Sequence, residues 1–178
     1  MKSGNPALAV SRFVEIELAF CLFCNRFKSP PILWLFRTVS RLGDGPFWYL
    51  MIVSLFVFEP ASGPLLAAGH VVGVGGVCLV TYKSIKRFTA RARPYVREAS
   101  IERLSAPLDQ YSFPSGHTLH AVAFTSVLIQ YQPQCAWALV PFTVLVALSR
   151  VILGLHYPTD VAAGAGLGAT IAHLSFAF

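Results

Sequence analysis

The chain has 178 residues, the length of one domain, and a formal net charge of +6 at pH 7. Apolar residues make up 55% of the chain and charged residues only 12%, whereas about 25% of an ordinary globular domain is charged. This composition excludes an ordinary soluble domain. A very apolar soluble helical bundle remains as the alternative to a membrane protein.

The segment before Gly43 is predicted to form amphipathic helices. Apolar residues step by three and four, which is the pattern of one helix face. One such stripe contains Phe13, Ile16, Phe20, Phe23 and Phe27, and a second, after Pro30-Pro31, contains Ile32, Phe36 and Val39. We expect these helices to lie on the membrane surface; ordinary packing of the stripes against a core is the alternative. Glu15 and Glu17 interrupt the apolar core that a signal peptide would need.

Beyond Gly43, long uncharged apolar stretches alternate with short polar connections. A bilayer span needs about 17–25 mostly apolar residues. The candidate spans are roughly 45–60, 63–83, 116–132, 134–153 and 159–178. We therefore predict an all-α fold, an integral membrane helical bundle with about five transmembrane helices plus N-terminal amphipathic interfacial helices. Residues 1–42 would form the interfacial region and residues 43–178 the membrane-embedded domain.

The distribution of basic residues predicts the orientation of such a bundle. The predicted spans put residues 1–44, 84–115 and 150–158 on one side of the membrane, and the turns near Glu59 and Pro133 on the other. Of the 14 Lys and Arg residues, 13 fall within the ranges on the first side, and Lys83 ends the span 63–83 at that same side. The positive-inside rule places that side in the cytoplasm, although basic residues also bind anionic headgroups. We expect a multi-pass protein of a bacterial inner membrane.

The first of three polar clusters contains Lys86 and Arg93. They are seven residues apart, about two helical turns, so we expect both on one face of a helix that Pro94 ends. Two cations aimed at one place suit a phosphate group. Arg87 and Arg91 fall on another face, where we expect them to meet lipid headgroups. Basic residues commonly flank a membrane span, so this cluster alone does not define a site.

The second cluster is Pro114-Ser115-Gly116-His117, at the start of the third predicted span. The N-terminus of a helix has unpaired N–H groups and a positive dipole end, which favour an anion. Gly116 lets the backbone approach that anion, and Ser115 adds a cap and a hydroxyl donor. His117 is then placed where a proton donor is needed. A capped helix start with an incidental histidine is the alternative.

The third cluster is Ser149-Arg150, followed by His156 and Asp160. A charge at the end of a span is costly unless it reaches water or a ligand, which makes Arg150 a candidate phosphate ligand. His156 and Asp160 are four residues apart, so the carboxylate can accept a hydrogen bond from one ring nitrogen and leave the other to attack. A polar turn with a capping Asp160 is the alternative.

Together, the patterns K-x6-RP, PSGH and SR-x5-H-x3-D resemble the three signature motifs of the type 2 phosphatidic acid phosphatase superfamily, which also includes vanadium haloperoxidases. The resemblance covers residues 86–160, and every signature position matches. It implies a metal-independent phosphatase with no cofactor. His156 would attack phosphorus and form a phosphohistidine, with Asp160 orienting it and His117 protonating the leaving group. The residues expected to hold the phosphoryl oxygens are Lys86, Arg93, Ser115, Gly116 and Arg150.

The resulting hypothesis is a membrane enzyme that removes phosphate from a lipid, with no nucleic-acid partner. Phosphatidic acid, phosphatidylglycerol phosphate and polyprenyl phosphates are the candidate substrates for a cytoplasmic site. An undecaprenyl diphosphate phosphatase with an outward-facing site is the alternative; a vanadate-dependent haloperoxidase and an inactive lipid-binding protein are less favoured. The sequence leaves the oligomeric state open. The connection 95–113 is predicted to contain a short helix around Ala99–Leu104 and to act as a lid or a linker. His120 could line the site, but a structural hydrogen bond is the favoured interpretation.

Overall fold

The computed structural model describes residues 6–58 and 63–177, and the side chains of residues 12–57 and 63–177. Regular secondary structure in these ranges is helical, as the sequence predicted. The elements are α1 (Pro6–Asn25), α2 (Pro30–Gly43), α3 (Pro46–Phe58), α4 (Pro64–Thr89), α5 (Pro94–Arg97), α6 (Gly116–Tyr131), the 3-10 helix η2 (Pro133–Cys135), α7 (Ala136–Ile152) and α8 (Pro158–Leu174). The predicted turn near Glu59 lies outside the described residues.

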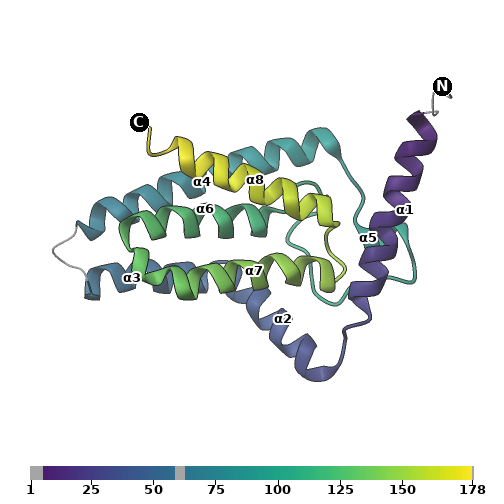
Figure 1. Cartoon of the computed structure of the whole chain (residues 1–178), viewed down its shortest axis with the longest axis horizontal. Helices are drawn as coiled ribbons and strands as arrows, with labels where there is room; N and C mark the ends of the chain where they lie inside the picture. Colours follow the sequence, from purple (N-terminus) through teal and green to yellow (C-terminus); the bar gives the residue numbers. More distant parts are fainter. Residues whose placement is uncertain (1–5, 59–62, 178) are drawn as a thin grey trace.

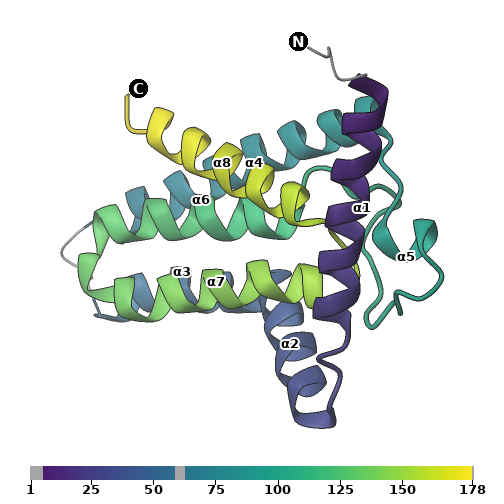
Figure 2. The ribbon, with the colours of Figure 1, turned by 45° about the vertical axis from the view of Figure 1, so that its right-hand side comes forward.

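The bundle consists of α3, α4, α6, α7 and α8, which run along the long axis of the molecule (Figure 1). Helix α1 crosses one end of this bundle, near α5 and the long connection before α6, and α2 runs obliquely from α1 to the bundle (Figure 2). Helix α6 is the most enclosed element. Its residues Leu119, Ala121, Ala123 and Val127 are fully buried. The N-terminus of this central helix lies at the end of the bundle that α1 crosses (Figure 2).

Helix α8 packs closely on α6 through two glycines. A Cβ atom added at Gly164 would lie 2.5 Å from the carbonyl oxygen of Ser115, and one at Gly168 would lie 2.4 Å from that of Leu119. Glycines four residues apart allow this kind of backbone approach between helices. The contact at Gly164 reaches the residue that caps α6, so the packing of α8 also positions the start of α6.

Two helical stretches among the described residues are long and apolar enough to cross a membrane, namely Pro64–Arg97 and Pro133–Ile152. The apolar helix Pro46–Val57 is shorter. Helices α6 and α8 have 16 and 17 residues, fewer than the ~20 of a typical span. The structure thus supports the predicted helical membrane bundle, with two of the predicted spans meeting the length and hydropathy of a full crossing.

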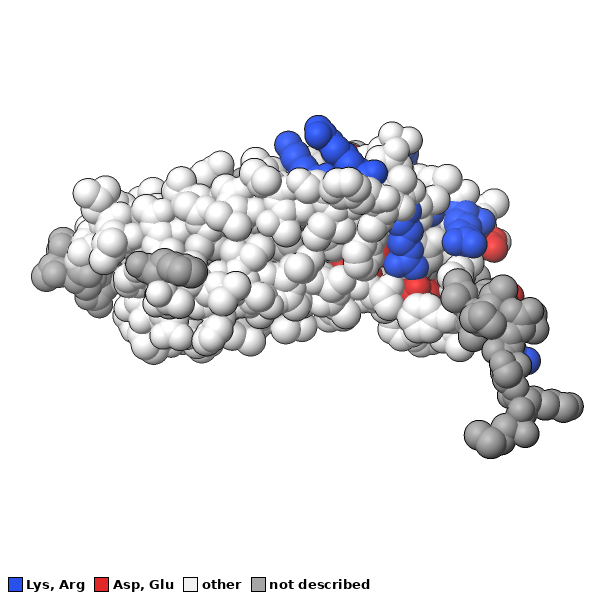
Figure 3. All heavy atoms as spheres, turned by 90° about the horizontal axis from the view of Figure 1, so that it is seen from above, with Lys and Arg blue, Asp and Glu red and all other residues white. Residues whose placement is uncertain are grey.

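Charge is strongly segregated along the bundle. On the face shown in Figure 3, the coloured acidic and basic side chains lie in the half of the molecule that carries α1 and near its middle, and the described residues at the opposite end are white. Large apolar side chains are exposed on the bundle helices, including Leu65 (76%), Val80 (66%) and Trp137 (82%). An apolar outer surface that ends in a charged rim is typical of a protein embedded in a bilayer.

Two expectations about local structure are wrong. Helix α4 ends at Thr89 rather than at Pro94, because Ala90 adopts a left-handed conformation and its N–H donates to the Lys86 carbonyl. The short helix lies at Pro94–Arg97 rather than around Ala99–Leu104, since a proline favours the first position of a helix.

Tertiary partners explain why the segment 99–104 is not helical. The N–H of Glu102 donates to Asn25 Oδ1 at 2.9 Å, and the N–H of Leu104 donates to the carbonyl of Leu153 at 3.2 Å. These bonds take backbone donors that a helix would use. They also tie the segment to α1 and to the end of α7.

The two N-terminal stripes have different environments. The α1 stripe is exposed, with its five side chains 44–67% accessible, and the buried face of α1 is formed instead by Glu17, Cys21 and Asn25. In α2, Val39 is buried in the main core and Phe36 packs against a smaller cluster around Leu153. Core packing therefore accounts for the α2 stripe, whereas the α1 stripe faces outward.

Candidate active site

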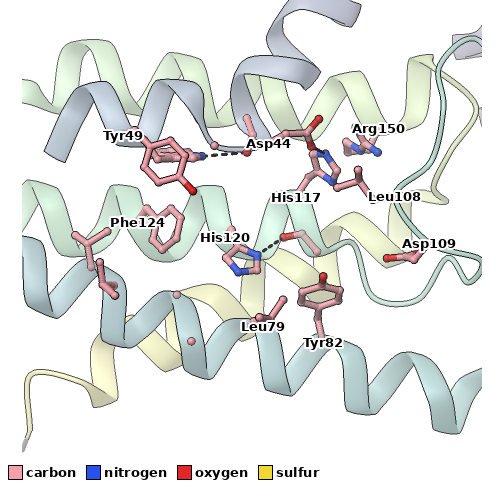
Figure 4. Close-up of a pocket in the computed structure, with 18 of the residues that line it drawn as sticks. Asp44, Tyr49, Leu79, Tyr82, Leu108, Asp109, His117, His120, Phe124 and Arg150 are labelled. Carbon is pink, nitrogen blue, oxygen red and sulfur yellow. Dashed lines mark hydrogen bonds and ion pairs between the residues drawn. The ribbon is translucent and has the colours of Figure 1, made fainter. Parts of the chain in front are cut away.

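A cavity of about 370 Å³ lies at the N-terminus of α6, between the α2–α3 turn, α4 and the loops at the charged end (Figure 4). The three sequence clusters converge on it. Six of the eight predicted site residues line this cavity, namely Lys86, Arg93, Gly116, His117, Arg150 and His156. Ser115 and Asp160 are fully buried and do not contribute to its wall.

Lys86 and Arg93 meet in the cavity although they do not share a helix. Lys86 projects from the last turn of α4, and its Nζ donates to Asp109 Oδ1 at 2.6 Å and to the Tyr111 carbonyl at 2.9 Å. Arg93, on the extended segment after α4, donates from Nη2 to the same Asp109 oxygen at 2.7 Å. Asp109 thus binds both cations of the first cluster, Lys86 and Arg93, which were predicted to hold a phosphate.

Arg93 also connects the first cluster to the third. Its Nη1 donates to the Leu155 carbonyl at 2.7 Å and lies 3.2 Å from His156 Nε2. Because a guanidinium can only donate, Nε2 accepts this bond and the neutral ring carries its proton on Nδ1. The unprotonated nitrogen of His156 therefore faces the cation cluster.

The start of α6 has the predicted cap. Ser115 Oγ accepts from the Thr118 N–H at 3.5 Å and lies 3.0 Å from Thr118 Oγ1, while the Ser115 N–H donates to the Asp160 carbonyl at 2.9 Å. The hydroxyl and N–H of Ser115 are thus engaged within the protein. At Gly116 a Cβ atom would lie 3.2 Å from the ring of Tyr82, so a larger residue would crowd this wall of the cavity.

His117 follows this cap and lies beside Asp44 and Arg150 in Figure 4. Its Nε2 pairs with Asp44 Oδ1, from the residue that caps the C-terminus of α2. His120, one turn further along α6, also lines the cavity, and its Nδ1 lies 2.9 Å from the Gly116 carbonyl. His120 thus lies in the cavity wall and also has the kind of hydrogen-bond partner that was favoured from the sequence.

Arg150 and His156 approach the cavity from the end of α7 and the loop that follows. Arg150 is 2% exposed and donates from Nη1 to Ser40 Oγ, and its Nε has no partner among the described residues. The loop turns at Gly154, with φ +74°, where a Cβ would lie 2.6 Å from the Glu102 carbonyl. Only glycine fits both the conformation and the space.

The side chains of His156 and Asp160 are adjacent, but they are not hydrogen-bonded. Nδ1 of His156 lies 3.5 Å from Asp160 Oδ2, which instead accepts the Tyr157 N–H at 2.9 Å. Burial lowers the pKa of His156 well below its ordinary value, and the nearby Arg150, Arg93 and Lys86 lower it further. The imidazole is therefore neutral at pH 7, as a nucleophile must be.

Sequence reasoning missed the contribution of four charged residues to the site, namely Asp44, Asp109, Glu17 and Arg91. Asp44 and Asp109 contact the predicted residues directly, and Glu17 reaches them through Arg91. The expectation that Arg91 meets lipid headgroups is wrong, because its guanidinium binds Glu17 and Asp160. The chain has only eight acidic residues, and this scarcity in an apolar protein was a signal that each could have a specific partner.

The geometry combines three cations with the imidazoles of His117 and His156 around one cavity, and it is suited to a tetrahedral anion. Among the side chains that the structure describes, no three His, Cys, Asp or Glu residues are grouped so as to hold a metal ion. A reaction at this site would draw its positive charge from Lys86, Arg93 and Arg150.

The model of the PAP2 superfamily matches residues 64–178. An undecaprenyl-diphosphatase of Sulfolobus acidocaldarius is 31% identical to this chain over 140 residues. The matched residues cover 77% of this chain and 66% of that relative, which is slightly less than two thirds of its length.

Two solved structures share the fold. The crystal structure of Aquifex aeolicus LpxE superposes with a TM-score of 0.78 at 25% identity, covering 90% of this chain and 94% of that one. The transmembrane PAP2 type phosphatidylglycerolphosphate phosphatase of Bacillus subtilis gives a TM-score of 0.70 at 23% identity, covering 94% of this chain and 86% of that one. The second likeness, at its lower identity, bears on the fold alone.

Proposed function

The chain belongs to the PAP2 superfamily, and on that premise we propose that it is a membrane-embedded phosphatase that hydrolyses the phosphomonoester or diphosphate of a lipid. One observation carries the proposal. The imidazoles of His117 and His156 and three cations, from three separate parts of the sequence, line one cavity at the charged end of an apolar helical bundle. Such a cavity can receive a phosphate headgroup while the lipid tail stays in the bilayer.

The proposed reaction has two steps. In the first, His156 Nε2 attacks phosphorus in line, the bond from phosphorus to the lipid oxygen breaks, and His117 donates a proton to that oxygen. In the second, water gives a proton to His117 and attacks phosphorus, and the bond to His156 breaks. Asp160 orients His156 and stabilises its positive charge. The 3.2 Å contact between Nε2 and Arg93 supports this assignment, because it places the attacking atom beside a phosphate-binding cation.

Phosphate binding is assigned to Lys86, Arg93 and Arg150, together with the backbone at Gly116. Ser115 would support it by capping the helix there, because its own hydroxyl and N–H are engaged within the protein. The cations hold the oxygens as charge redistributes in the transition state, the task that magnesium performs in many phosphoryl-transfer enzymes. Asp109 must release Lys86 and Arg93 as the substrate enters. No metal or cofactor takes part in this scheme.

In the membrane, we assign α3, α4, α6, α7 and α8 to the five spanning segments of a domain that covers residues 43–178. Residues 1–42 form an interfacial region, supported by the exposed aromatic stripe of α1. The short α3, α6 and α8 are compatible with local thinning of the bilayer. The apolar part of the cavity wall, which includes Ile52, Leu79 and Phe124, offers a path for the lipid tail.

The active site is proposed to face the cytoplasm of a bacterial inner membrane. Ser100 is exposed on the loop beside the cavity, so a Ser100→Cys variant reports the orientation through a membrane-impermeant thiol reagent. We expect labelling above that of the parent chain only after the cells are opened. Labelling in intact cells would reverse the orientation and favour an outward-facing undecaprenyl diphosphate phosphatase.

The substrate class is tested by a panel of lipid phosphates in the presence of a chelator. The panel contains phosphatidic acid, phosphatidylglycerol phosphate, polyprenyl phosphates and undecaprenyl diphosphate, and the measured quantity is phosphate release. We expect turnover of at least one lipid by the wild type and none by His156→Ala that still folds. No release from any lipid would contradict the proposed function, and phosphate release in the absence of vanadate would exclude a vanadate-dependent haloperoxidase.

A further inference from the structure

We propose that Glu17 of α1 is a positioning residue of the active site, which acts through Arg91 on Asp160 and so on His156. The inference rests on the proposed function, since it assigns a task within that reaction. Glu17 lies outside the residues that the family model matches, 64–178. The N-terminal helix would then complete the catalytic machinery in addition to lying on the membrane.

The inner face of α1 packs on the loop that carries His156. Glu17, Cys21 and Asn25 are spaced by four residues and are all buried. Cys21 Sγ lies 3.8 Å from the His156 carbonyl, and Asn25 Nδ2 donates to the Ile152 carbonyl at 3.1 Å. These contacts fix α1 against both ends of the α7–α8 connection.

A continuous chain of charged contacts leads from this face to the proposed nucleophile. Glu17 Oε2 accepts from Arg91 Nη2 at 2.6 Å, and Arg91 Nη1 donates to Asp160 Oδ1 at 2.7 Å. The other oxygen of Glu17 accepts the Thr159 N–H at 3.1 Å. The Arg91 guanidinium also stacks over the ring of Tyr157 with its Cζ 3.9 Å from the ring centre. Arg91 is thereby held in one orientation from three directions.

The charges in this chain explain why Glu17 matters for the reaction. Asp160 is fully buried and Glu17 is 4% exposed, so their charges are weakly screened. Arg91 alone would neutralise Asp160, whereas Glu17 and Arg91 together leave the group with one net negative charge. His156 becomes positively charged when it bonds to phosphorus. A net negative charge beside it therefore stabilises the transition state more than the free enzyme.

Two more residues that precede the family match contact the site. Ser40 accepts a hydrogen bond from Arg150, and Asp44 pairs with His117. The segment before the family match thus contacts Arg150 and His117 directly, and Asp160 through Arg91. This pattern supports a role for this segment in the site, while the test below concerns Glu17.

The test compares Glu17→Gln with Glu15→Gln, an exposed glutamate on the same helix. Both variants remove one negative charge, but only the first removes it from the contact with Arg91. We expect Glu17→Gln to lower kcat about tenfold or more, the scale of residues that orient a catalytic group, with KM within about twofold. Glu15→Gln should change neither. A wild-type kcat in Glu17→Gln would overturn the proposal, as would an equal loss in both variants.

A binding measurement separates this inference from the proposed function. Orthovanadate can bond to a ring nitrogen and so mimic the transition state, whereas inorganic phosphate binds without a covalent bond. We expect Glu17→Gln to weaken vanadate binding about tenfold and phosphate binding less than about threefold. Equal weakening of both ligands, or of neither, would overturn the inference. This readout requires no lipid turnover, so it decides the role of Glu17 even if the lipid panel fails.

A second variant covers the case in which Glu17→Gln does not fold. Arg91→Lys keeps the positive charge but cannot donate to Glu17 and Asp160 in the same bridging geometry. We expect the same selective loss of kcat and of vanadate binding, with thermal unfolding in detergent as the check on folding. Wild-type values of both quantities in a folded Arg91→Lys protein would contradict the proposal.

Discussion

The contact between α6 and α8 gives a sharp prediction for Gly164→Ala. The added Cβ would lie 2.5 Å from the Ser115 carbonyl oxygen, about 1 Å inside an ordinary van der Waals contact. The obstacle is backbone rather than a movable side chain, so the two helices must separate. Overpacking of this kind lowers the free energy of unfolding by about 1–3 kcal/mol. The better helix propensity of alanine offsets about 1 kcal/mol of that loss.

Gly166→Ala is the matched control for this substitution. It lies on the same helix, and its Cβ meets nothing within 4 Å, so it should keep the gain of up to about 1 kcal/mol from helix propensity. For a chain of this length, 1 kcal/mol corresponds to about 2–4 °C in Tm. We expect Gly164→Ala to lower Tm by a few degrees and Gly166→Ala to leave it equal or higher.

The same contact links stability to activity. The Ser115 N–H donates to the Asp160 carbonyl, so displacement of α8 at Gly164 also moves Asp160 relative to the start of α6. Thermal unfolding in one detergent and phosphate release are measured for both variants. Equal Tm and equal turnover for Gly164→Ala and Gly166→Ala would refute the close packing that the structure shows.

Two further predictions concern the cavity. Asp109→Asn removes a negative charge from between Lys86 and Arg93. The inhibition constant of inorganic phosphate as a competitive inhibitor should therefore fall about tenfold, which corresponds to about 1.4 kcal/mol. An unchanged inhibition constant would contradict a shared phosphate site. The lowered pKa of His156 means that below pH of about 6.5 the unfolded chain binds a proton that the folded protein rejects. The Tm of the wild type should therefore fall more between pH 7 and pH 5 than that of His156→Ala, and identical losses would argue against a neutral buried His156.

The polar clusters could be predicted from the sequence because each one carries its chemistry locally. PSGH places a cap, a glycine and a histidine at one helix start, and His156 and Asp160 are adjacent through their four-residue spacing. Hydropathy likewise indicated the bundle helices. Each of these features depends on residues that are close in the chain.

Features that depend on distant partners could not be predicted in this way. The contact between Glu17 and Arg91 joins residues 74 apart in sequence, and no local pattern pairs them. Helix α4 ends at Ala90 in a left-handed conformation, without the glycine that usually marks such an end. The segment 99–104 resembles a helix in composition, but Asn25 and Leu153 take its backbone donors.

Trapping the covalent intermediate tests the central claim most directly. An aryl phosphate labelled with radioactive phosphorus has a leaving group that needs no proton, so His117→Ala should form the phosphohistidine but hydrolyse it slowly. After a basic quench, we expect an acid-labile label on the peptide that contains His156, and no label in the His117→Ala/His156→Ala double variant. A label that persists in the double variant, or wild-type turnover with no label on His156 in His117→Ala, would contradict the assignment of His156 as the nucleophile.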